Sequence, residues 1–292
     1  MRSLLFVPGD SEKKLDKGLS AGADVLIIDL EDSVAPERKP LARRIAADFL
    51  AGARGQTRAI LYVRVNELDG GMTDDDLAAV MAAAPDGVML PKCCGAADAV
   101  RLSAKLRVAE AQAGLADGST AVIPLITETA RALLAAPSFC VPLPRVAGVT
   151  WGAEDLSADI GARETRDPRG RYADVFRHAR TMTLLAATAT QAAAIDTVFV
   201  DFRDLDALAA ECAEAERDGF TGKMAIHPAQ VPVINDAFTP SGASIAQAHA
   251  IVKAFEDAGN PGVVGLGGKM YDRPHLRRAE RLLARAAVAG LA

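Results

Sequence analysis

The sequence predicts a (β/α)8 barrel that carries a helical extension at its C-terminus. Eight short apolar runs alternate with amphipathic segments, and each run ends at polar, charged or glycine residues. Such runs are typical of buried parallel strands, and the segments between them are long enough for right-handed crossovers. Barrel enzymes place their catalytic groups at the carboxyl ends of the strands. The same pattern therefore indicates an enzyme with its active site at that rim.

The strands are predicted from runs rich in β-branched and other apolar residues. They are expected at Ser3–Val7, Val25–Leu30, Ile60–Val65, Val88–Leu90, Val122–Ile126, Ala147–Trp151, Thr197–Val200 and Lys223–Ile226. Alanine-rich segments between them are predicted to be helices, for example Asp74–Ala84, Ala96–Ala113 and Leu205–Asp218. The longest gap between strands holds the polar loop Gly161–Arg171, and a loop of that length in a compact domain is usually functional.

Residues 1–240 are expected to form the catalytic barrel, and residues 241–292 a helical extension. In the extension we expect an amphipathic helix at Ile245–Ala258, a flexible glycine-rich loop at Gly259–Gly268, and a last helix from about Pro274. A barrel closes without such an addition. The extension is therefore predicted to be a lid, a contact with a neighbouring subunit, or both.

Composition narrows the classes of function. The chain has 292 residues, half of them apolar, which is enough for a sizeable core. A net charge of −5 gives no basic surface for nucleic acid, and no apolar run is long enough to span a membrane. Its four cysteines lack CxxC spacing, which favours reduced thiols over a disulfide framework or a zinc site. Together with an N-terminal apolar stretch too short for a signal peptide, these features predict a cytoplasmic protein.

Two acidic strand ends are the main candidate site. Glu128 follows the fifth predicted strand, and the adjacent Glu154 and Asp155 follow the sixth. Only one of that adjacent pair is expected to face the site, and we assign Asp155. Carboxylates on neighbouring strands, with no histidine nearby, suit a hard divalent cation bound through oxygen. The alternative for Glu128 is capping of the helix that follows.

Charged residues also lie at other strand ends, and the sequence allows more than one role for each of them. Arg64 ends the third strand and could be an ordinary ion-pair partner of Glu31 or Asp32, which follow the second. The acidic cluster Asp29, Glu31 and Asp32 could instead orient Arg64 and Lys92, the latter a candidate partner for a carboxylate or phosphate. His227, after the eighth strand, is more often a structural turn residue than a general base.

Several motifs occur in a fixed order and cover nearly the whole chain. They are Leu4–Gly9, Asp29–Val34, Trp151–Leu156, Gly219–Lys223, Ile226–Gln230 and Gly268–Asp272. Taken together, they resemble the citrate lyase β-subunit and malyl-CoA lyase family, within the HpcH/HpaI aldolase and citrate lyase superfamily.

The resemblance implies a Mg²⁺-dependent carbon–carbon lyase or the reverse synthase. Such enzymes split a malyl-, citramalyl- or citryl-CoA-like thioester into an acetyl-type thioester and an oxo acid. Glu128 and Asp155 would hold the metal, with Glu128 also binding substrate, and Arg64 would grip the oxo acid or stabilise oxyanion charge. Asp272 matches the family's acid/base residue, which a neighbouring subunit delivers. A homo-oligomer, a trimer or hexamer, is therefore implied.

Two alternatives remain open. A β-subunit-like lyase could act on a citryl thioester attached to a carrier protein. A non-catalytic, metal-binding barrel could instead serve as an assembly partner. The second is motivated by Cys94, which stands where many relatives carry an acidic residue. Loss of that carboxylate is expected to leave Lys92 without its partner.

Overall fold

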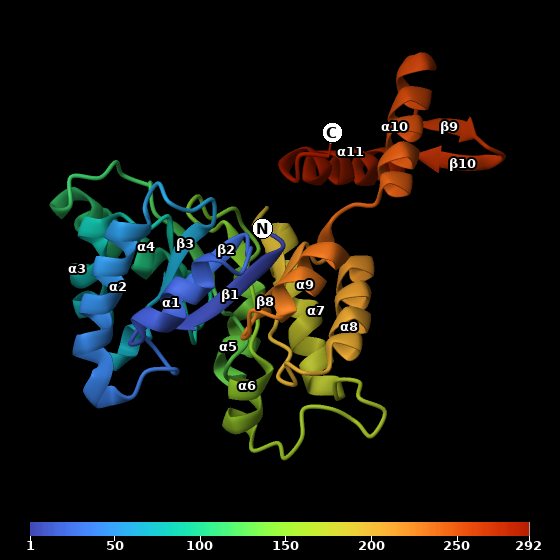
Figure 1. The fold of residues 1–292 in the computed structure, drawn as a ribbon. Coiled ribbons are helices and arrows are strands. Elements are labelled where there is room, and N and C mark those ends of the chain that lie inside the picture. The colour runs from blue at the N-terminus through green and yellow to red at the C-terminus, as the bar shows by residue number, and fades with distance from the viewer. Residues whose placement is uncertain (292) are drawn as a thin grey trace. The chain divides into compact units, whose positions relative to one another are not determined.

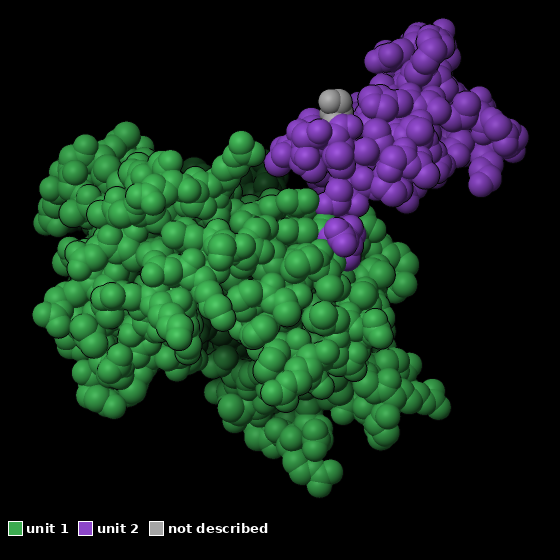
Figure 2. Space-filling model, in the orientation of Figure 1, with its two compact units in different colours: residues 1–235 green, residues 236–292 purple. Residues whose placement is uncertain are grey.

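A computed structural model describes residues 1–291 of the chain and divides it into two compact units. The first, the barrel unit, runs from Met1 to Asn235, and the second starts at Asp236 (Figure 2). The sequence analysis placed a domain boundary after residue 240. No helix among the described residues is long and apolar enough to cross a membrane.

Eight strands form the main sheet, and two more form a separate hairpin. They are β1 (Ser3–Pro8), β2 (Val25–Asp29), β3 (Ile60–Arg64), β4 (Gly87–Leu90), β5 (Ala121–Pro124), β6 (Gly148–Val149), β7 (Ala193–Asp196), β8 (Gly222–Ala225), β9 (Val263–Leu266) and β10 (Lys269–Asp272).

The helices of the barrel unit alternate with its strands and lie around their outside (Figure 1). They are α1 (Glu12–Leu19), α2 (Lys39–Ala53), α3 (Thr73–Val80), α4 (Ala96–Gln112), α5 (Ala130–Ala135), α6 (Ala153–Ile160), α7 (Asp174–Ala189) and α8 (Leu205–Asp218). The boundary between the units falls within α9 (Gln230–Phe238), and the second unit contains α10 (Gly242–Asp257) and α11 (Arg273–Val288). Short 3₁₀ helices are η1 (Pro36–Arg38), η2 (Leu68–Gly70), η3 (Met81–Ala83) and η4 (Ala136–Ser138).

The main sheet is parallel throughout and closes on itself. Its strand order is β5-β4-β3-β2-β1-β8-β7-β6. Parallel bridges between Val122 and Val146 and between Leu125 and Thr150 join its two ends. The Ile126 N–H donates to the Thr150 carbonyl at 3.1 Å across this join. The predicted (β/α)8 barrel with a helical extension is therefore confirmed.

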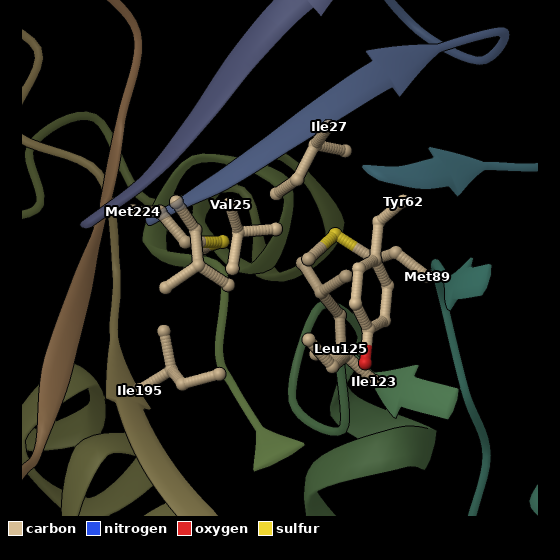
Figure 3. Packing of buried hydrophobic residues seen from close by; sticks show 9 residues of the cluster. Val25, Ile27, Tyr62, Met89, Ile123, Leu125, Ile195 and Met224 are labelled. Atoms are coloured by element: carbon tan, nitrogen blue, oxygen red, sulfur yellow. The ribbon is translucent and has the colours of Figure 1, made fainter. Parts of the chain in front are cut away.

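Apolar side chains fill the inside of the barrel, so it is a packed core rather than a pore. Strands on opposite sides contribute to this core through the residues Leu4, Val25, Ile27, Tyr62, Met89, Ile123, Leu125, Ile195 and Met224 (Figure 3). All nine are at most 2 % exposed. The packed interior leaves only the rims of the barrel for chemistry.

The seventh strand lies earlier in the chain than predicted. Thr197–Val200 was expected to be the strand because its residues are β-branched, but the strand observed is Ala193–Asp196. Pairing decides the outcome: Ala193 lies opposite Gly148 of β6, and Ile195 opposite Gly222 of β8. The prediction was wrong because it relied on the apolar residues of the later run and not on strand pairing. In consequence the acidic residue Asp196 ends this strand.

The predicted flexible loop Gly259–Gly268 is also wrong in part. Its second half forms β9, which pairs with β10 as an antiparallel hairpin. Gly267 and Gly268 make the two-residue turn, with φ of +57° and +74°. Such a turn needs positive φ at both positions, which glycine adopts without strain. The glycines therefore build a tight turn here. The hairpin packs with α10 and α11 around Phe255 in the second unit.

A buried ionic network ties β7 and β8 to the outer helices. The Lys223 Nζ lies 3.0 Å from Asp196 and 2.8 Å from Glu211 of α8, and neither Lys223 nor Asp196 is exposed. Burial alone would raise the pKa of Asp196, but the Lys223 and Arg180 charges outweigh it and lower the pKa. Asp196 also accepts the indole N–H of Trp151 at 2.8 Å, and Trp151 follows β6 in the chain.

Replacing Lys223 by Met should destabilise the barrel unit by about 3 kcal/mol, because Asp196 would keep a buried charge without its main partner. Urea unfolding followed by circular dichroism measures the change. The matched control is Lys105→Met, which breaks an exposed pair with Asp74 and should cost less than about 0.5 kcal/mol. Equal effects of the two substitutions would contradict the assigned role of the network.

Candidate active site

The carboxyl ends of β2 to β6 bring a dense group of charged residues together. It contains the acids Asp29, Glu31, Asp32, Glu128 and Asp155 and the bases Arg64 and Lys92. The strands are parallel and in register, so all of these residues lie at one rim of the barrel. The sequence analysis had singled out the same rim.

Glu128 is as deeply buried as Asp29, with 1 % of its surface exposed. Its Oε2 accepts the backbone N–H of Lys92. The end of β6 packs directly on it, since a Cβ at Gly152 would lie 2.8 Å from the Glu128 Cγ. The helix cap of α5 is Thr129, whose side chain accepts the Ala132 N–H at 3.0 Å. Glu128 therefore does not cap this helix.

The environment of Glu128 disfavours its charge. Burial and then the nearby Asp155 charge raise its pKa to about 8, and the Lys92 N–H and the Arg64 charge offset this only in part. At neutral pH this carboxyl takes up a proton unless a cation compensates it. A cation held by both Glu128 and Asp155 would remove the repulsion that raises this pKa.

Asp155 lies in the first turn of α6, beside Glu128. Its side chain is half-buried, and its Oδ1 is 3.6 Å from the Lys92 Nζ. The neighbouring Glu154 is exposed. The structure thus directs Asp155 toward the charged group and leaves Glu154 outside it.

Arg64 is fixed by two acids of the second strand's end. Its Nε and Nη2 each lie 2.7 Å from an Asp29 oxygen in a bidentate pair, and its Nη1 is 3.0 Å from Glu31. Burial would raise the pKa of Asp29, but the charge and hydrogen bonds of Arg64 lower it. Of the acids expected around Arg64, Asp29 and Glu31 are its partners, and Asp32 pairs with Lys92. Arg64 therefore forms the ion pair that its position suggested, and this pair orients the guanidinium at the rim.

Lys92 connects the second strand's acids to the fifth and sixth strands. Its Nζ forms an ion pair with Glu31 and another with Asp32 at 3.3 Å. The expectation that Cys94 leaves Lys92 without a partner is therefore wrong, because the acids after β2 supply the partners. The Cys94 N–H instead donates to Asp98 at 2.9 Å.

Lys39 supports the site and was missed in the sequence. It is 8 % exposed, and its Nζ donates to the Leu30 and Glu31 carbonyls at 2.9 and 3.0 Å. A third bond goes to the Asn66 Oδ1 at 2.6 Å. These contacts fix the end of β2, which carries Glu31. A lysine between two predicted strands carries no local signal of such a role.

His227 and Asp272 each have partners of their own. The His227 ring stacks on Phe202 with centroids 4.6 Å apart, and its Nδ1 accepts the Ala229 N–H, which fits a structural turn. Asp272 belongs to the second unit and caps α11 in a capping box with His275. The His275 hydrogen bond is the main cause that lowers the pKa of Asp272.

A cavity of about 420 Å³ lies elsewhere in the barrel unit, between α7 and α8. Arg166 and Arg180 line it, but they pair at 2.6 Å with Glu211 and Asp218. None of the acids at the strand ends lines this cavity. We place the candidate site at the strand ends, because the buried Glu128 lies there close to the Asp155 charge and to the bases Arg64 and Lys92.

Comparison with known proteins agrees with the barrel fold. The HpcH/HpaI aldolase/citrate lyase model matches residues 2–228. A (3S)-malyl-CoA thioesterase of Cereibacter sphaeroides is 36% identical over 289 residues, which cover 98% of this chain and 94% of that protein. The mitochondrial citramalyl-CoA lyase of Rattus norvegicus is 33% identical over 295 residues, covering 97% of this chain and 85% of the relative.

A solved structure resembles the chain along its whole length. CitE from Mycobacterium tuberculosis, in complex with magnesium, acetoacetate and coenzyme A, superposes with a TM-score of 0.77 at 34% identity. The match covers 98% of each chain. The chain therefore belongs to the HpcH/HpaI aldolase/citrate lyase family, as the motifs of its sequence predicted.

Proposed function

We propose that this protein is a Mg²⁺-dependent carbon–carbon lyase, or the reverse synthase, acting on a CoA thioester whose acyl group carries a second carboxylate. One observation carries the proposal. Glu128 and Asp155 follow β5 and β6, and burial of Glu128 together with the nearby Asp155 charge raises the pKa of Glu128 to about 8. The names of the relatives and the magnesium and coenzyme A in the CitE complex support it.

The residues at this rim fit Mg²⁺. Among the described residues no three acids, histidines or cysteines form a complete metal-binding set. Two carboxylates suffice for Mg²⁺, which keeps several waters and takes its remaining ligands from the substrate. Glu128 and Asp155 would hold the ion. When bound, it would act as a Lewis acid and template for the oxygens of the oxo acid.

Arg64 would bind the carboxylate of the oxo acid or stabilise oxyanion charge. A guanidinium has five N–H donors, and Asp29 takes two of them through Nε and Nη2. Donors on Nη1 and Nη2 remain for a ligand while Asp29 keeps the group in place. Cleavage sends the electron pair of the broken carbon–carbon bond to the thioester as an enolate, while the hydroxyl loses its proton to form the oxo acid.

Asp272 would move the proton at the acetyl carbon. Its carboxylate is charged at neutral pH, as a base in the synthetic direction requires, and the hydrogen bond from His275 lowers its pKa further. We propose that the second unit of a neighbouring subunit delivers it, which requires a homo-oligomer.

The substrate class can be tested directly with the purified chain. Acetyl-CoA and Mg²⁺ are mixed with glyoxylate, pyruvate or oxaloacetate, and products are followed by mass spectrometry together with free thiol. A carbon–carbon adduct with at least one oxo acid, lost when the metal is chelated, is the expected result. Thiol release that follows adduct formation would add the hydrolysis named for the malyl-CoA relative. No adduct with any oxo acid would favour the non-catalytic assembly role.

Glu128→Gln and Asp155→Asn should each lower kcat/KM at least about 100-fold, since each removes a proposed metal ligand. Circular dichroism should show an intact fold for both variants. Glu154→Gln is the matched control, because Glu154 neighbours Asp155 but is exposed, and it should keep nearly full activity. Loss of activity in the control with retention in Asp155→Asn would reverse the assignment.

Affinity for Mg²⁺ should rise about tenfold per pH unit up to about pH 8 and then level off. A carboxyl with a pKa of about 8 is mostly protonated at neutral pH, and metal binding must displace that proton. Titration calorimetry in two buffers of different ionisation enthalpy measures the affinity and the proton release together. An affinity independent of pH between about 6 and 8, with no proton released, would contradict the raised pKa of Glu128.

A further inference from the structure

Lys92 has a strained backbone at the rim of the barrel. Its φ is +50°, in the left-handed region that residues other than glycine seldom adopt. Contacts at both ends of the residue hold it there: the backbone N–H donates to Glu128, and the ammonium pairs with Glu31 and Asp32. Strain of this kind persists where the surroundings over-determine it, most often at functional sites.

The same ammonium also reaches the other proposed metal ligand. Lys92 Nζ is 3.6 Å from the Asp155 Oδ1, with 23% of the Lys92 side chain exposed. The contact is therefore only partly screened by solvent. A divalent cation shared by Glu128 and Asp155 would lie within a few ångströms of this ammonium and repel it as a like charge.

We propose that Lys92 is a positioning residue that competes with Mg²⁺ for Asp155 and so sets the metal affinity of the site. The inference rests on the proposed function of Glu128 and Asp155. When the ammonium gives up Asp155, it can stay paired with Glu31, because the contact with Glu31 is the closer one. Its backbone N–H would continue to orient Glu128. One residue would thus order one metal ligand and restrain the other.

The test is the Mg²⁺ affinity of charge variants, measured by titration calorimetry at one pH. Lys92→Met removes the charge but keeps the backbone contact to Glu128, and it should bind Mg²⁺ about tenfold more tightly. Lys92→Gln provides a second neutral side chain, for which the same gain is expected. Lys92→Arg keeps the charge and should restore an affinity close to that of the wild type. Lys105→Met, far from the rim and paired with Asp74, should change nothing.

A merely structural lysine would give the opposite pattern. Unchanged or weaker Mg²⁺ binding by both neutral variants, with circular dichroism showing intact folds, would overturn the competition while leaving the metal site in place. If the wild type itself binds no Mg²⁺, the proposed function fails, and this inference fails with it. The two failures are therefore distinguished by the wild-type titration alone.

Discussion

The repulsion between Glu128 and Asp155 is the constraint on which the rest of the site depends. A buried carboxylate beside a second one is stable only with a proton or a cation. Two basic residues lie nearby, but each already forms an ion pair with an acid: Arg64 with Asp29, and Lys92 with Glu31. This arrangement leaves Glu128 short of compensating charge, as its raised pKa shows. A site with such a deficit suits a divalent metal better than it suits a structural ion pair.

The barrel creates this constraint by its topology. Parallel strands in register deliver their last residues to the same rim, so the acids that follow β2, β5 and β6 meet although they are far apart in the sequence. The packed interior and the Lys223–Asp196 network hold the strands that carry them. Gly152 leaves room for Glu128, because any larger residue at this position would collide with the Glu128 side chain.

Much of the fold was predictable because the periodicities of strands and helices can be recognised in short stretches of the sequence. The carboxylates and Arg64 stood out because each directly follows an apolar run. What failed depended on partners distant in the sequence. The seventh strand was set by pairing with Gly148 and Gly222 rather than by propensity. The role of the buried Lys39 likewise comes from contacts that no local pattern contains.

The central claim is that Glu128 and Asp155 together bind one divalent ion. The most direct measurement is a crystal structure with Mn²⁺ as an anomalous scatterer in place of Mg²⁺. The account predicts one strong peak within about 2 Å of an oxygen of each carboxylate, with Glu154 outside the coordination sphere. A peak bound by Glu154, or by the acids after β2 without Glu128, would contradict it.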